Sequence, residues 1–276
     1  METKVFNIHT KGKLVYLTFP SLEKTGLVNH CFSTRLGGVS KSVYSTLNLG
    51  YNRGDSDVNV DNNYKIICDA IGVNHNNLVF SDQVHGDDIY IVTKEDIDIG
   101  RNNNSNIINK DALITNEKNI PLVTLYADCV PLFFLDPVKK VIGLAHAGWR
   151  GTVKKIGKKT VLKMAEVYGS NIKDIIAGIA PSIGGCCFEV GEEVVDMFRK
   201  FFLKEKSSSI IREKRGKKYM LDLWEANYYT LLEAGLLIEN ITLTDICTKC
   251  HSDIFFSHRD SGGERGSLAA IIALKG

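Results

Sequence analysis

The stretch "PLVTLYADCVPLFFLDPVKKVIGLAHA", residues 121–147, contains three strand-like runs in direct succession. The runs are PLVTLYADCV (121–130), PLFFLD (131–136) and KVIGLAHA (140–147), and they are apolar and bounded by turn residues. Strands that follow one another directly are typical of a mixed α+β domain rather than of a doubly wound parallel sheet. This stretch therefore predicts a strand-rich, layered α+β fold.

The rest of the chain supplies further strands and a smaller number of helices. Apolar residues at helical spacing, with a glycine at the end or the start of each run, predict helices over 60–72, 151–169, 191–202 and 222–235. Strand-like runs cover 13–19, 77–85, 88–93, 174–180, 240–246 and 267–274. The basic run 204–218 is predicted to be a surface loop. No segment resembles a linker, so we expect residues 1–276 to form a single domain with helices covering mixed sheets.

Composition and charge exclude several classes of protein. The chain has 276 residues, 44% of them hydrophobic and 24% charged, and a formal net charge of +2, which gives no basic field for nucleic acid. The N-terminal segment has no signal-peptide pattern, and no run of 18 apolar residues predicts a membrane span. Seven cysteines, an odd number, are typical of a reducing compartment. We therefore expect a cytoplasmic protein with no nucleic-acid or membrane partner.

Three polar residues lie at the ends or interruptions of the apolar runs: His85, Cys129 and His146. Each is followed within two positions by a glycine or a proline, and strand ends are where loops gather and sites form. Two imidazoles and one thiolate suit zinc, and three protein ligands with one open position are typical of a catalytic zinc. The residues alone equally allow a nucleophilic Cys129 with His146 as its base, or a Cys129 that is simply a buried apolar residue.

Further candidates are weaker when judged one by one. Arg35 precedes two glycines and Arg150 stands near the start of a helix, and both positions favour an anion such as phosphate. The pair Cys247 and Cys250 forms a C-x-x-C, but no second pair follows at zinc-ribbon spacing, so neither zinc nor redox chemistry is expected there. The adjacent thiols in GGCCF (184–188) are a poor chelate, and small-residue packing is the simpler interpretation.

The order of these segments resembles one family. STRLGG, LNLG, DQVHG, DALIT, ADCVPLFFLDP, GLAHAGWRGT, IAPSIGGCCFEVGEEV, DLWEAN and CTKC…FFSHRDSGGERG together resemble the YfiH/laccase-domain family, formerly called multicopper polyphenol oxidases. The resemblance runs from about residue 30 to the C-terminus. It implies a single α+β domain of mixed sheets sandwiched by helices, with zinc held by His85, Cys129 and His146. On that basis Cys129 interrupts its strand as a metal ligand, and Pro131 ends the local ladder.

The resemblance also implies purine nucleoside chemistry. The expected reaction is zinc-dependent phosphorolysis of adenosine, inosine and methylthioadenosine to free base and ribose 1-phosphate, with some adenosine deamination. Phosphorolysis needs cations for phosphate, for which Arg35 and Arg150 are candidates, with Asn48 as a neutral donor to sugar or phosphate. Two alternatives stay open: a cysteine-dependent hydrolase of a peptidoglycan precursor, and a copper-dependent polyphenol oxidase. The last is less favoured, because a multicopper centre needs many histidines and the chain has seven, scattered.

Some positions depart from the family pattern. The family's "HVGD" is NRGD (52–55) here, so a histidine sometimes present near the site is absent, and its "IGPCIGP" is IAPSIGG. Neither change touches the three expected ligands, but the first bears on substrate preference. Asp87 would serve as a proton shuttle only if its turn folds back toward the site.

Overall fold

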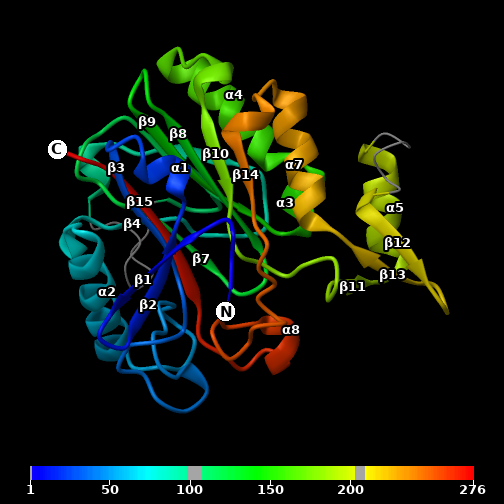
Figure 1. Cartoon of the computed structure of the whole chain (residues 1–276), viewed down its shortest axis with the longest axis horizontal. Coiled ribbons are helices and arrows are strands. Elements are labelled where there is room, and N and C mark those ends of the chain that lie inside the picture. The colour runs from blue at the N-terminus through cyan, green and yellow to red at the C-terminus, as the bar shows by residue number, and fades with distance from the viewer. Residues whose placement is uncertain (1, 98–106, 203–208) are drawn as a thin grey trace.

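The computed structural model of the chain describes residues 2–97, 107–202 and 209–276. Figure 1 shows strands in the centre of the molecule with helices on either side of them. The helices are α1 (Pro20–Glu23), α2 (Asp57–Ile71), α3 (Trp149–Val153), α4 (Ile156–Tyr168), α5 (Glu192–Phe201), α7 (Leu223–Ala234) and α8 (His258–Ser261). The predicted α+β class, with mixed sheets sandwiched by helices, is confirmed.

Two six-stranded sheets form the centre. The first has the order β1 (Asn7–Lys11), β2 (Leu14–Thr18), β3 (Val28–Ser33), β15 (Leu268–Leu274), β7 (Leu122–Tyr126) and β4 (Val79–Phe80). The second has the order β14 (Ile241–Leu243), β10 (Ile176–Ile179), β8 (Val130–Asp136), β9 (Val141–Ala147), β6 (Ala112–Thr115) and β5 (Ile89–Ile91). Each sheet is mixed, because β4 pairs parallel to β7 in the first, and β14 to β10 and β5 to β6 in the second.

Alternation of side chains along the strands explains the layers. In β8, Phe133 and Leu135 point into the core between the two sheets, whereas Leu132 and Phe134 point to the opposite face, which packs under α4 and α7. Successive side chains of a strand lie on opposite faces, so a fully buried strand covered on both sides must be apolar throughout. The first sheet is covered on its outer face by α2. The layers are therefore helix, sheet, sheet and helices.

A small third sheet stands apart from the two large ones. It consists of β11 (Glu189–Val190), β13 (Lys218–Leu221) and β12 (Ile211–Lys214) in that order, and it lies beside α5 (Figure 1). The prediction of a loop over 204–218 is wrong for residues 211–214, which form β12, and for Lys218, which begins β13; residues 204–208 lie outside the described part.

Two other local predictions need correction. The helix expected over 151–169 is two helices, α3 and α4, because Lys155 adopts a left-handed conformation with φ 60° between them. Pro131 does not end a ladder: it is the second residue of β8 and lies opposite His146 in β9. Its missing N–H costs no pairing with β10, because it is the Pro131 carbonyl that accepts the amide of Ala180. The interruption of the strand is instead the bend at residues 127–129 between β7 and β8.

No described helix is long and apolar enough to cross a membrane.

Candidate functional site

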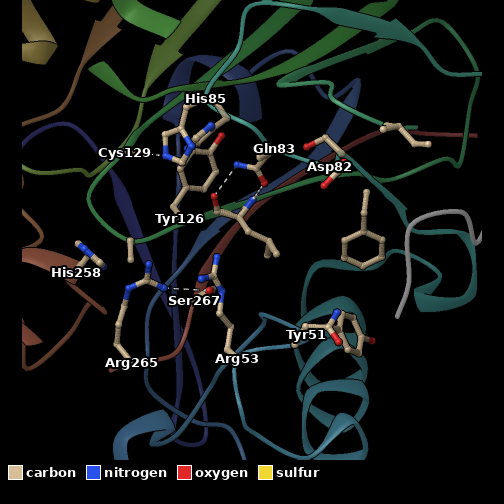
Figure 2. Close-up of a pocket in the computed structure, with 17 residues that line it drawn as sticks. Tyr51, Arg53, Asp82, Gln83, His85, Tyr126, Cys129, His258, Arg265 and Ser267 are labelled. Carbon is tan, nitrogen blue, oxygen red and sulfur yellow. Dashed lines mark hydrogen bonds between the residues drawn. The ribbon is translucent and has the colours of Figure 1, made fainter. Parts of the chain in front are cut away.

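The structure brings His85, Cys129 and His146 together. The Sγ atom of Cys129 lies 3.8 Å from Nε2 of His85, and the ligand atoms of all three residues lie within 4.8 Å of one another. They come from the loop after β4, the bend before β8 and the end of β9. Figure 2 shows His85 and Cys129 side by side at one end of a cavity.

Strand pairing places two of the three side chains. The β8–β9 register sets Pro131 opposite His146, and Cys129 lies two residues before Pro131. An antiparallel pair keeps opposite residues within side-chain contact, so the turn that begins β8 delivers the thiol to the imidazole of the next strand. A one-residue slip would turn His146 to the other face.

A buried carboxylate, which the sequence alone did not identify as a site residue, positions the other elements. Asp111 accepts hydrogen bonds from the backbone amides of Val84, His85 and Gly86 at 3.1, 3.0 and 2.7 Å. The loop wraps around this carboxylate, and His85 adopts φ 60° in doing so. The only signal for Asp111 was its place at the start of the DALIT segment. Asp111 therefore fixes the backbone from which the His85 side chain reaches the Cys129 thiol.

The same carboxylate orients His146. The Nδ1 atom of His146 lies 2.8 Å from Oδ1 of Asp111, and both residues are almost fully buried. With Nδ1 held by Asp111, the Nε2 atom remains to face Cys129. This is the arrangement in which a carboxylate fixes the tautomer and ring orientation of a metal-binding or catalytic histidine.

The thiol and the imidazole shift each other's ionisation. Burial would raise the pKa of Cys129, but the charge and hydrogen bonds of His146 and His85 outweigh it and lower the pKa to about 6. Burial would lower the pKa of His146, but Cys129 and Asp111 raise it to about 9. Both partners are therefore stabilised in their charged forms, as a thiolate beside an imidazolium.

The donor set fits a single tetrahedral metal ion. Zinc bonds of about 2.3 Å to sulfur and about 2.0–2.1 Å to nitrogen put the two ligand atoms roughly 3.6 Å apart in a tetrahedron, close to the 3.8 Å between Cys129 and His85. Three protein ligands leave the fourth position open.

The three side chains border a cavity of about 850 Å³. The cavity lies between the strand ends and the loops after β3 and β14, and Figure 2 shows its walls. Its lining residues are Tyr51, Asn52, Arg53, Phe80, Ser81, Asp82, Gln83, His85, Ile108, Leu125, Tyr126, Ala127, Cys129, His146, His258, Arg265 and Ser267. A volume of this size is typical of small-molecule sites.

Two arginines line the cavity at a distance from the His–Cys group. Figure 2 shows Arg53 and Arg265 below His85 and Cys129, with the guanidinium of Arg265 directed upward. Arg265 donates from Nη1 to the Gly266 carbonyl and to Ser267 Oγ at 3.0 and 3.3 Å. Its buried Nε has no hydrogen-bond partner among the described residues. Burial and the charge of Arg53 both lower the pKa of Arg265.

Two further polar side chains of the cavity wall already form hydrogen bonds within the protein. The Gln83 side chain donates to and accepts from the backbone of Leu125 at 2.8 and 2.7 Å, which ties the His85 loop to β7. The Tyr126 hydroxyl lies 2.8 Å from Thr124 Oγ1 and 3.1 Å from the Ala145 carbonyl oxygen, and it can donate a hydrogen bond to either. These two side chains shape the cavity and hold it rigid.

None of the three predicted substrate-binding residues, Arg35, Asn48 and Arg150, lines this cavity. Arg35 donates to the carbonyls of Ser45 and Ser252, both at 2.9 Å, and stacks on Phe256. Asn48 is buried and accepts the amide of Ser267 at 2.8 Å, so it supports a lining residue from behind. Arg150 is exposed and stacks on Trp149.

Residues of three other segments can be placed relative to the cavity. His258 lines the cavity, whereas Arg259 donates to the Glu189 carbonyl at 2.8 Å outside it. Asp87 forms ion pairs with Lys154 and Lys159 and is not a lining residue, so its turn does not fold back toward the site. Asn52 and Arg53, at the NRGD departure, both line the cavity.

Comparison with known proteins identifies the family of this chain. The family model described as multi-copper polyphenol oxidoreductase laccase matches residues 29–275. The purine nucleoside phosphorylase YlmD of Bacillus subtilis is 39% identical over 245 residues, covering 88% of this chain and 87% of that protein. The adenosine deaminase RL5, from an unknown prokaryotic organism, is 33% identical over 240 residues, covering 85% and 90%.

A solved structure has the same fold. The crystal structure of the hypothetical protein YfiH of Bacillus licheniformis superimposes with a TM-score of 0.91 at 34% identity, covering 97% of this chain and 99% of that one. Sequence match and fold agree over nearly the whole length of the chain. The chain therefore belongs to the multi-copper polyphenol oxidoreductase laccase family.

Proposed function

We propose that the chain is a zinc-dependent purine nucleoside phosphorylase that also deaminates adenosine. Relatives named purine nucleoside phosphorylase and adenosine deaminase support a purine nucleoside as the substrate. The observation that carries the proposal is the composition of one cavity, in which a His–Cys metal-binding set and a pair of arginines share the walls.

The arginine pair supports phosphate as the second substrate. Two like charges in a partly buried wall repel each other, which is why the charge of Arg53 lowers the pKa of Arg265. A dianion between the two guanidinium groups would remove that cost. We expect phosphate at this end of the cavity.

The metal would be held by His85, Cys129 and His146, with Asp111 orienting His146. When bound, zinc supplies a Lewis acid that polarises an oxygen at the open position. Asp111 and the rigid β8–β9 pair keep the three donor atoms in place, so no reorganisation is needed as the substrate binds.

The remaining walls suit a nucleoside. Tyr51 and Phe80 present aromatic surface to the cavity, and we expect the purine to lie against it. Arg53 and Arg265 would orient phosphate toward the anomeric carbon of the sugar. The phosphate oxygen then forms a bond to that carbon as the bond to the base nitrogen breaks and the base takes the electron pair. The arginines contribute positioning and charge neutralisation.

The deciding assay measures base release with and without phosphate. Inosine should give hypoxanthine and ribose 1-phosphate only when phosphate is present, whereas adenosine should give inosine in its absence. Both activities should fall together in His85→Ala and His146→Ala, because two protein ligands hold a catalytic zinc poorly. Equal hypoxanthine release in phosphate-free buffer would rule out phosphorolysis.

Arginine variants test the anion site. Arg53→Ala and Arg265→Ala should each raise the KM for phosphate by about 10- to 150-fold, which corresponds to roughly 1.5–3 kcal/mol for a charge-assisted hydrogen bond. Arg150→Ala is the matched control, because that side chain is exposed and outside the cavity. If Arg150→Ala changes the phosphate KM and the other two do not, the anion site lies at α3, as the sequence suggested.

A second candidate is favoured by one observation. Cys129, His146 and Asp111 are arranged as nucleophile, base and orienting carboxylate, as a cysteine-dependent hydrolase of a peptidoglycan precursor would need. One observation argues against this candidate. His85 places a second imidazole 3.8 Å from the Cys129 thiol, and a cysteine hydrolase does not need a second imidazole there. A hydrolase should keep its activity after chelation and lose it when Cys129 is alkylated. A zinc enzyme should lose activity on chelation and recover it with zinc.

Copper oxidation of phenols is the weakest of the three. Among the described residues, which include all seven histidines, only His85 and His146 belong to a metal-binding group. A multicopper centre needs more imidazoles than these two.

A further inference from the structure

Four cysteines from two distant loops meet outside the cavity. Cys186 and Cys187 follow β10, and Cys247 and Cys250 follow β14. The Sγ atom of Cys250 lies 3.4 Å from that of Cys187 and 3.7 Å from that of Cys186, and Cys186 and Cys187 are 3.7 Å apart. All four sulfur atoms lie within 4.8 Å of one another.

This arrangement overturns both expectations drawn from the sequence. The C-x-x-C at 247–250 lacked a second pair at zinc-ribbon spacing, but the fold supplies one from residues 186–187. Packing does not account for the adjacent thiols, because Cys186 and Cys250 are exposed. Parallel β10 and β14 bring the two loops to the same end of the second sheet, which local spacing could not reveal.

The spacing of the sulfur atoms fits one tetrahedral ion. Zinc–sulfur bonds of about 2.3 Å put the sulfur atoms of a tetrahedral tetrathiolate roughly 3.8 Å apart. The observed 3.4–3.7 Å is close to this value and well above the distance of about 2.05 Å in a disulfide. A cluster of several irons and sulfides would need more room than four sulfurs within 4.8 Å enclose.

The surroundings already hold the four thiols in this geometry. The Gly184 amide donates to Cys247 Sγ at 3.2 Å, an interaction that stabilises a thiolate. The two loops are joined by the bridge between Ser182 and Cys247, with the Thr248 amide donating to the Ser182 carbonyl at 3.0 Å. The ligand positions are therefore set by backbone contacts.

We propose that Cys186, Cys187, Cys247 and Cys250 bind one zinc ion as a structural site. Four protein ligands leave no open position, which is the pattern of a structural zinc rather than a catalytic one. The inference is independent of the function proposed for the cavity.

The site would fasten the loop that carries part of the cavity wall. Thr248, between two of the ligands, donates to the carboxylate of Asp128 at 2.6 Å, and Asp128 directly precedes Cys129. The same loop continues to His258 and Arg265, both of which line the cavity. Loss of the ion should therefore loosen these positions without removing any group from the cavity.

Zinc content per chain separates the two sites. Protein purified in a non-chelating phosphine reductant should hold two zinc ions per chain, and Cys250→Ser and Cys129→Ala should each hold one. The double variant should hold none. Cys68→Ser, which changes a buried thiol of α2, is the matched control and should keep both ions. A Cys250→Ser chain with as much zinc as the unmodified protein would overturn the proposal, whatever the Cys129 variant shows.

Cobalt provides a test that does not depend on the folding of the Cys250 variant. In Cys129→Ala, which keeps all four thiols, Co²⁺ should give the strong sulfur-to-metal charge-transfer bands and visible bands of a tetrahedral tetrathiolate. The proposal would also be overturned if these bands were absent. A Cys187–Cys250 disulfide that persists under reductant, in protein that lacks a second metal ion, would overturn it as well.

Discussion

At the scale of single residues, the sequence predicted the three side chains of the candidate metal site but not what positions them. His85, Cys129 and His146 stand at strand ends, a local property that periodicity reveals. Arg53, Arg265 and Asp111 lie in turns, and only the tertiary fold brings them to the cavity or behind it. Arg35 looked equally suitable because the glycines beside it suggested an open backbone, whereas the structure uses its guanidinium for internal carbonyls.

Gly148 shows how closely the backbone approaches the site. A Cβ atom there would lie 2.8 Å from His85 Cδ2 and 3.1 Å from Cys129 Sγ, while its φ of −63° suits any residue. Gly148→Ala should therefore displace two ligands without straining the backbone. We expect at least a tenfold loss of metal affinity, as for a disturbed ligand shell, with little change in the thermal midpoint. Metal titration and calorimetry check this, and unchanged affinity would show that the ligands can shift.

His30 should make stability depend on pH. Burial lowers its pKa to about 4 from 6.5, and its Nε2 accepts the Phe19 amide at 2.8 Å, which requires the neutral ring. The unfolded chain binds this proton below about pH 6.5 and the folded chain only near pH 4, so the stability is complete above 6.5 and falls between these values. The loss should reach roughly 3 kcal/mol at pH 4.

Urea unfolding across this range isolates the contribution when His30→Gln is measured beside the unmodified chain. The nearby Glu23 is present in both proteins, so its titration cancels to first order. The stability of the variant should decline less steeply between pH 6.5 and 4. Parallel curves for the two proteins would assign the acid sensitivity to other groups.

At the scale of elements, the apolar runs in 121–147 predicted the strands, and the prediction failed where single residues adopt turn conformations. The break between α3 and α4 depends on a left-handed Lys155, a residue with no special preference for that conformation. The bend at 127–129 similarly depends on Asp128, whose φ is 83°. Such single-residue conformations are set by tertiary contacts. The apolar pattern of the sequence therefore continues across them and does not reveal the break.

Asp128 joins the bend to the loop after β14. Its buried carboxylate accepts Thr248 Oγ1 at 2.6 Å, Ser257 Oγ at 3.0 Å and the Arg259 amide at 2.7 Å. Asp128→Ala should lower the free energy of unfolding by roughly 3 kcal/mol, because it leaves buried donors unpaired. Asp128→Asn should cost less, since asparagine tolerates φ > 0 and keeps one acceptor. Urea midpoints test the order, and equal losses in the two variants would show that the retained acceptor of asparagine contributes nothing to stability.

At the scale of the whole molecule, the last strand is at the centre. β15 pairs with β3 on one side and β7 on the other, so the C-terminal residues complete the first sheet. Side chains of both large sheets share one core, in which Leu268 and Ala270 of β15 lie with Phe133 of β8. The sheets pair strands that lie far apart in the sequence, and the periodicity of apolar residues does not predict which strands pair. This pairing also gives a physical reason to expect residues 1–276 to behave as one unit.

That expectation can be tested with probes in different layers. Trp149 and Trp224 pack on the helix side of the second sheet, whereas Cys68 is a buried residue of α2, which covers the outer face of the first. Because the shared core links these layers, Trp fluorescence and protection of Cys68 from alkylation should be lost at the same urea concentration. Mass spectrometry of the Cys68 peptide separates its labelling from that of the exposed Cys186 and Cys250. Two distinct midpoints would mean that the sheets unfold separately and that the chain contains two cooperative units.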